Sequence, residues 1–159
     1  MLFDLAKVRP GMRVAITAGS RGITGIASIL ATVVCELKRL GAAPFLVPAM
    51  GSHGSATAEG QLAVLNSLGI TDLAIGCPIR SSMETAQIGQ TTEGIPVLID
   101  KIAASADGIV VVNRIKAHTE YTGPVESGWM KMLTIGLGKH QGALMAHRNA
   151  VQLDRKSVV

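Results

Sequence analysis

The chain has 159 residues, a length that predicts one domain with a sizeable core. It is 48% hydrophobic but only 3% aromatic, and this composition suits strands that are buried on both faces. No apolar run reaches the length of a membrane span, the N-terminus lacks the apolar core of a signal peptide, and the two cysteines have no metal-binding spacing. We therefore expect a cytoplasmic protein that does not bind a membrane.

The net charge of +4 comes from the last third of the chain. From Arg114 onward there are seven Lys/Arg against three Asp/Glu, whereas the residues before it carry eight of each. With a single Trp and a single Tyr, the chain lacks the alternation of aromatic and basic residues that stacks on single-stranded bases. We therefore expect no nucleic-acid partner. The basic excess indicates either a positive field for a small anionic ligand or an ordinary basic surface.

Strands and helices are expected to alternate along the chain with short connections. This order predicts one α/β domain over residues 1–159, with a mostly parallel sheet and flanking helices in three layers. The expected strands cover residues 13–17, 44–49, 95–100 and 108–113. The expected helices cover residues 22–40 before Gly41, 57–68 before Gly69, 101–106 after the capping Asp100, and 125 onward. Residues 70–76 and 85–89 stay ambiguous, and residues 92–94 are expected to form a turn.

Three polar loops, AGSRG, GSHGS and KAHTE, each follow an expected strand. Because the carboxyl ends of parallel strands meet at one edge of a sheet, these loops are expected to lie together. They carry Arg21, His53 and His118. The two histidines could act as general base and general acid on opposite sides of one small substrate, or they could be ordinary exposed loop residues.

The segment VAITAGSRGITG has the strand–turn–helix context of a dinucleotide-binding turn and is similar to the start of short-chain dehydrogenases. It departs from that pattern at Ala18 and Thr24, where glycine is required. The chemistry also needs a lysine one helical turn after a tyrosine, whereas Tyr121 is followed four residues later by Val125. An NAD(P)-dependent dehydrogenase therefore stays the weakest alternative.

The region after residue 125 contains the other candidate residues. Lys131 stands among apolar residues, so its amine either reaches out to water or lies in a pocket that makes it nucleophilic. His140 and His147 are seven residues apart, roughly 10 Å along a continuous helix, which is too far for both to bind one metal ion. Three closely spaced glycines between residues 136 and 142 predict a bend instead of a straight helix.

Two motifs, PAMGSHGSAT and VNRIKAHTEYTGPVESGWMKMLTIGLGKHQGA, together with the histidine that follows at position 147, resemble the nickel-pincer lactate racemase family. The resemblance implies that Lys131 forms a thioamide to a pyridinium dicarbothioic acid mononucleotide and that His147 ligates its nickel. It also implies that His53 and His118 are the acid/base catalysts and that Arg21 lies at the active site. Because the nickel-pincer nucleotide itself supplies three donors, the protein then needs to supply one imidazole.

The resemblance implies a racemase or epimerase that acts on a small 2-hydroxy acid by hydride transfer, with the cofactor-synthesis enzymes as further partners. Two departures stand out: Ala18 replaces an acidic residue of the early motif, and thirteen residues separate His118 from Lys131. Family members are longer and carry a second domain, so we expect this chain to lack that C-terminal domain. A truncated, non-catalytic α/β domain is the alternative. The sequence identifies neither the hydroxy acid nor the oligomeric state.

Overall fold

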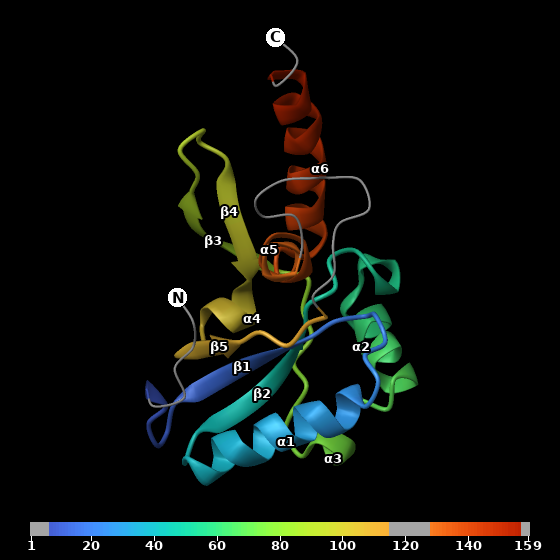
Figure 1. Cartoon of the computed structure of the whole chain (residues 1–159), viewed down its shortest axis with the longest axis vertical. Coiled ribbons are helices and arrows are strands. Elements are labelled where there is room, and N and C mark those ends of the chain that lie inside the picture. The colour runs from blue at the N-terminus through green and yellow to red at the C-terminus, as the bar shows by residue number, and fades with distance from the viewer. Residues whose placement is uncertain (1–6, 115–127, 157–159) are drawn as a thin grey trace.

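The computed structural model describes residues 7–114 and 128–156 (Figure 1). Its main sheet has three parallel strands in the order β2-β1-β5. The strands are β1 (Arg13–Ala18), β2 (Ala43–Pro48) and β5 (Gly108–Val110). The predicted α/β class is therefore confirmed. No helix in the described ranges is long and apolar enough to cross a membrane.

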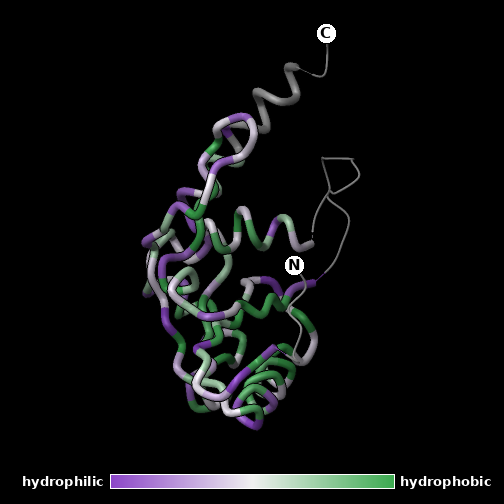
Figure 2. The backbone as a smooth tube through the Cα atoms, turned by 90° about the vertical axis from the view of Figure 1, so that its left-hand side faces the viewer, coloured by the Kyte–Doolittle hydropathy of each residue, from purple (hydrophilic) through white to green (hydrophobic). Residues whose placement is uncertain are grey.

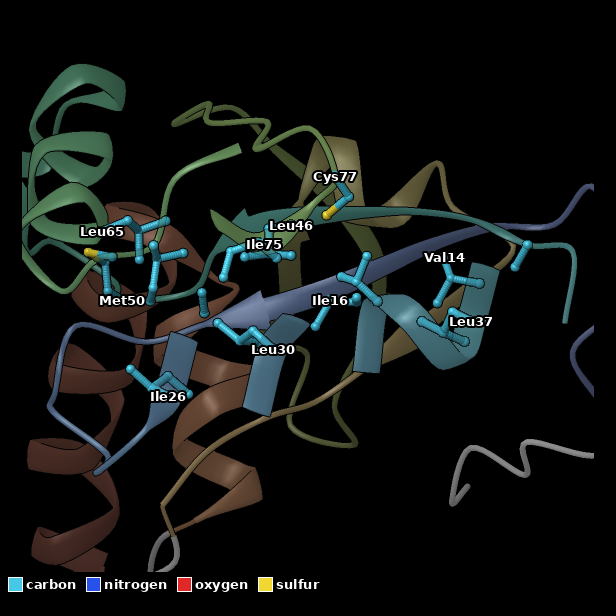
Figure 3. Close-up of a cluster of buried hydrophobic side chains, with 14 residues drawn as sticks. Val14, Ile16, Ile26, Leu30, Leu37, Leu46, Met50, Leu65, Ile75 and Cys77 are labelled. Carbon is cyan, nitrogen blue, oxygen red and sulfur yellow. The ribbon is translucent and has the colours of Figure 1, made fainter. Parts of the chain in front are cut away.

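One face of this sheet packs against three helices: α1 (Ile26–Arg39), α2 (Ala58–Ser67) and α3 (Asp72–Ile75). Along β1, Val14 and Ile16 point to this face, because side chains of a strand alternate between its two faces. Figure 3 shows Leu30 and Leu37 of α1 beside these two strand residues. Figure 2 shows that hydrophobic residues are frequent in the lower half of the molecule, where α1 and the main sheet lie.

The opposite face of the sheet has its own buried cluster. Ala15 of β1 and Phe45 of β2 point to this side, where they pack with Ile99, Ala103 and Leu137. The last three residues come from strand β4 (Pro96–Asp100), helix α4 (Lys101–Ala104) and the segment that precedes the last helix. The sheet is thus buried on both faces between two outer layers, as the composition predicted.

The predicted strand at residues 95–100 exists, but it does not join the parallel sheet. Instead, β4 pairs antiparallel with β3 (Thr85–Gln90) in a separate two-stranded sheet (Figure 1). The expected turn connects the two strands, with the Gly94 amide donating to the Thr91 carbonyl at 2.9 Å. The ambiguous segments are also resolved, because residues 85–89 belong to β3 and residues 70–76 contain α3.

Two predicted boundaries were wrong at the edge where the loops gather. Helix α1 begins at Ile26 instead of residue 22, because Gly25 takes a left-handed φ of 70° at the N-cap. Strand β5 ends at Val110 instead of residue 113. Beyond that point the Thr17 hydroxyl accepts a hydrogen bond from the Val112 amide at 3.0 Å, so a side chain replaces the strand ladder.

Two other helix ends agree with the sequence prediction, and a third differs from it by one residue. Gly41 follows α1 with a left-handed φ of 80°, and its amide donates to the Lys38 carbonyl at 2.8 Å. Helix α2 begins at Ala58, one residue after the expected start, because Thr57 is its N-cap and accepts from the Gly60 amide at 3.0 Å. Asp100 caps α4 in the same way, through the Ala103 amide at 2.9 Å.

The C-terminal region is helical but broken, as its glycines predicted. Helix α5 (Trp129–Lys131) continues into a π-helical segment, η3 (Met132–Gly136), and helix α6 (Lys139–Lys156) follows. The break lies at Lys139, whose φ of 56° is left-handed. Figure 1 shows α5 almost end-on beside the long axis of α6, so the two helical segments meet at an angle.

Candidate active site

The carboxyl ends of β1, β2 and β5 lie at one edge of the sheet. The loop after β1 carries Arg21, and the loop after β2 carries His53 (Figure 1). The third expected loop is described only to Arg114, and His118 lies outside the described residues. Two of the three polar loops are therefore placed together at this edge, as predicted.

A hydrogen bond joins the first two loops. Ser20 Oγ lies 2.5 Å from His53 Nδ1. At the start of the same two loops, the Ala49 amide donates to the Ala18 carbonyl at 2.8 Å. His53 is exposed, and its Nδ1 is engaged by Ser20 whether the ring nitrogen donates or accepts. The other ring nitrogen, Nε2, is then the one left for a ligand. Sequence reasoning missed Ser20, although it adjoins Arg21.

We call residues 51–57 the His53 turn. It includes the short 3-10 helix η2 (Gly54–Ala56), for which His53 is the N-cap, and it packs directly on α2. A Cβ added to Gly60 of α2 would lie 1.9 Å from the Gly54 carbonyl oxygen. Only glycine therefore fits at position 60, and this close approach fixes the turn against the helix.

A buried side chain holds the same turn from below. The Gln61 amide nitrogen donates to the Gly51 carbonyl at 2.9 Å and to the His53 carbonyl at 3.3 Å. Its amide oxygen accepts from the Lys139 ammonium group at 3.2 Å. The side chain of Gln61 is fully buried, so these contacts replace water for both of its polar atoms.

Lys139 and Asp100 form a buried ion pair beneath the site. Lys139 Nζ lies 2.9 Å from Asp100 Oδ2 and donates to the Pro48 carbonyl at 2.6 Å. Both side chains are fully buried, and Oδ2 accepts no well-aligned hydrogen bond within the described part of the chain. Burial lowers the pKa of Lys139, and the negative charge of Asp100 opposes that shift. The sequence indicated only the capping role of Asp100 and gave no sign of Lys139.

The π-helical segment η3, which directly follows Lys131, packs against both loops. Gly51 of the His53 turn donates its amide to the Gly136 carbonyl of η3 at 3.2 Å. A Cβ on Gly136 would lie 2.9 Å from the Ala49 carbonyl oxygen, and a Cβ on Gly19 would lie 3.5 Å from the Met132 side chain. These contacts place α5 and η3 across the carboxyl edge of the sheet.

Lys131 ends α5 and is exposed. It has no hydrogen bond or ion pair to any other described residue, and neighbouring Trp129 and Met130 are also exposed, at 41% and 47%. The exposure agrees with an amine that reaches out from the apolar segment. The buried lysine of this region, whose pKa is lowered by desolvation, is instead Lys139.

The remaining predicted residues are placed as follows. Arg21 is exposed, two residues after Gly19 in the loop that follows β1. His140 is exposed at the second position of α6. The backbone of His147 belongs to α6, roughly two turns past its start, and the side chain of His147 lies outside the described part.

The described residues contain no group of three or more His, Cys, Asp or Glu side chains that could hold a metal ion. Of the two cysteines, Cys77 is buried, and burial raises its pKa from 9.0 to about 11.

These features define an α/β domain whose candidate site lies at the carboxyl edge of a parallel sheet, between two polar loops and a helix with an exposed lysine. Residues 4–158 match the family model described as the lactate racemase N-terminal domain, and the chain belongs to this family. The match agrees with the resemblance noted in the sequence motifs. No curated protein and no solved structure matches the chain significantly.

Proposed function

We propose that the protein is a racemase or epimerase of a small 2-hydroxy acid that works with a nickel-pincer nucleotide. The observation that carries the proposal is the convergence of the Ser20–His53 contact and the Lys131 helix at one edge of the sheet. Membership of the lactate racemase N-terminal domain family supports it, because that family provides the racemase context.

The residues present fit this cofactor. The exposed amine of Lys131 is accessible for a covalent link, and its apolar neighbours Trp129 and Met130 offer a surface for an aromatic ring. His147 on α6 would supply the single protein ligand that the nickel requires. When bound, the group supplies an acceptor and donor for the C2 hydride of the substrate.

The protein's own residues would move the proton and orient the acid. With its Nδ1 engaged by Ser20, His53 would use Nε2 to take the hydroxyl proton of one enantiomer and return it. His118 would serve the opposite face of the substrate in the same role. Arg21 would hold the carboxylate, a task suited to its bidentate guanidinium.

Four single variants test these roles, with the protein coexpressed with the cofactor-synthesis enzymes. His147→Ala should lose nickel and keep the fold. His53→Ala and His118→Ala should keep nickel and lose racemisation of a 2-hydroxy acid by ~10²–10⁴ in rate, the usual effect of removing one general base. His140→Ala is the matched control on the same helix as His147, and it should change neither quantity.

Nickel content and racemisation rate are measured for all four variants and for wild type. If His140→Ala removed the metal while His147→Ala kept it, the assignment of the nickel ligand would be wrong. If both His53→Ala and His118→Ala racemised at the wild-type rate, the acid/base assignment would fail while the metal assignment could still stand.

A further inference from the structure

We propose that Gln61, Lys139 and Asp100 are positioning residues that fix the His53 turn against the start of α6, the helix that carries His147. The inference rests on the proposed function, in which His53 is the general base. None of the three side chains would touch the substrate, because all three are fully buried beneath the turn. Their effect would pass through the backbone of the turn.

Lys139 sets the orientation of the Gln61 amide. Lys139 carries only donors, so it can contact Gln61 only through the amide oxygen, as it does at 3.2 Å. The amide nitrogen must then face the other way, toward the Gly51 and His53 carbonyl oxygens at 2.9 and 3.3 Å. Lys139 thereby fixes the side-chain orientation that holds the turn.

Asp100 compensates the buried charge of Lys139. A buried ammonium group needs a compensating charge, and Asp100 provides it at 2.9 Å. A buried ion pair is often no more stabilising than apolar residues of the same volume, so a gain in stability alone does not account for it. A fixed orientation of Gln61 does account for it. An apolar residue at position 139 could not distinguish the amide oxygen of Gln61 from its amide nitrogen.

Lys139 and Asp100 also join several elements of the fold. Lys139 is the first residue of α6, and it donates to Pro48 at the end of β2 at 2.6 Å. The Asp100 amide donates to the Leu137 carbonyl at 2.7 Å, which ties β4 to the segment before α6. One network therefore connects the His53 turn with the start of the helix that carries His147.

The experiment compares the imidazole of His53 in wild type, Gln61→Glu and the control Gln87→Glu. The chain has four histidines, so the ring nitrogens of His53 can be assigned by two-dimensional NMR of 15N-labelled protein. In Gln61→Glu an oxygen replaces the donor that faces two carbonyl oxygens, and the turn has to move. Gln87 undergoes the same chemical change on the exposed strand β3.

We expect Gln61→Glu to shift the 15N resonances of the His53 ring, because the Ser20 contact at Nδ1 changes, while Gln87→Glu leaves them unchanged. In the cofactor-loaded protein, Gln61→Glu should lower kcat by up to ~10² with a smaller change in KM, the effect of displacing a catalytic group by about 1 Å. Unshifted His53 resonances in a folded Gln61→Glu variant would overturn the inference.

A measurement on wild type keeps the inference testable if Gln61→Glu does not fold. The side-chain amide protons of Gln61 should exchange with solvent far more slowly than those of Gln87, because two carbonyl groups hold them. Equal exchange rates would overturn the inference. Both NMR readouts are independent of racemisation, so an active His53→Ala variant would refute the acid/base role of His53 and leave them unaffected.

Discussion

Replacement of Lys139 by Met removes a buried cation and leaves the Asp100 carboxylate without the ammonium group that faces it. The change loses an ion pair at 2.9 Å and hydrogen bonds to Pro48 and Gln61 at 2.6 and 3.2 Å. Methionine fills much of the volume of the lysine stem, so the effect is mainly electrostatic. Removal of one partner of a buried ion pair costs ~3–5 kcal/mol, a large part of the ~5–15 kcal/mol that stabilises a typical domain.

The double variant Lys139→Met/Asp100→Asn separates charge from packing. Asn at position 100 keeps the side-chain oxygen that caps α4, and it removes the uncompensated charge. We expect the double variant to recover most of the lost free energy of unfolding. Urea unfolding followed by far-ultraviolet circular dichroism measures wild type, both single variants and the double variant.

A free energy of unfolding of Lys139→Met within ~0.5 kcal/mol of wild type, the range of an ordinary surface substitution, would contradict this prediction. Additive effects of the two single variants in the double variant would contradict it as well. Additivity would mean that the two charges do not depend on each other, despite the 2.9 Å between them.

Three further predictions concern Gly60, Ser20 and Cys77. Gly60→Ala should destabilise the chain by ~1–3 kcal/mol in urea unfolding, because the new Cβ would lie 1.9 Å from a carbonyl oxygen of the His53 turn. The control Gly22→Ala should be tolerated, because a Cβ at position 22 would have no atom within 4 Å. Ser20→Ala should lower the racemisation rate about fivefold through the loss of a ~1 kcal/mol hydrogen bond to His53, and an unchanged rate would remove Ser20 from the site. Burial in the folded chain raises the pKa of Cys77 from 9.0 to about 11. As the pH rises between these two values, the thiol is deprotonated in the unfolded chain but still protonated in the folded one. The free energy of unfolding should therefore fall over this pH range. The fall relative to Cys77→Ala should approach ~1.4 kcal/mol per pH unit in urea unfolding, and parallel pH profiles would contradict it.

Local patterns were enough to predict much of the fold. The helix stop at Gly41, the cap at Asp100 and the buried strands each depend on a few neighbouring residues. The same patterns placed the loops with Arg21 and His53 at one sheet edge, because parallel strands align their carboxyl ends. Periodicity alone could not show that residues 95–100 pair antiparallel in a separate sheet, since pairing partners are set by tertiary packing.

The network beneath the site could not be predicted, because its contacts join residues that are distant in sequence. Lys139 meets Pro48 and Gln61 across 91 and 78 residues, and no local motif announces either contact. Its left-handed φ of 56° is also unusual for a lysine, so the break before α6 was expected at the glycines around it. The sequence instead directed attention to Lys131, which has apolar neighbours but is exposed.

The proposed function depends most directly on Lys131, the residue that would carry the cofactor of a 2-hydroxy acid racemase. The most direct measurement is intact and peptide mass spectrometry of the protein coexpressed with the cofactor-synthesis enzymes in medium containing nickel. We predict an added mass on the peptide that contains Lys131. This mass should be lost in Lys131→Arg and retained in the control Lys101→Arg, which changes a residue of a surface ion pair. A wild-type protein that racemises a 2-hydroxy acid with Lys131 unmodified would contradict the account.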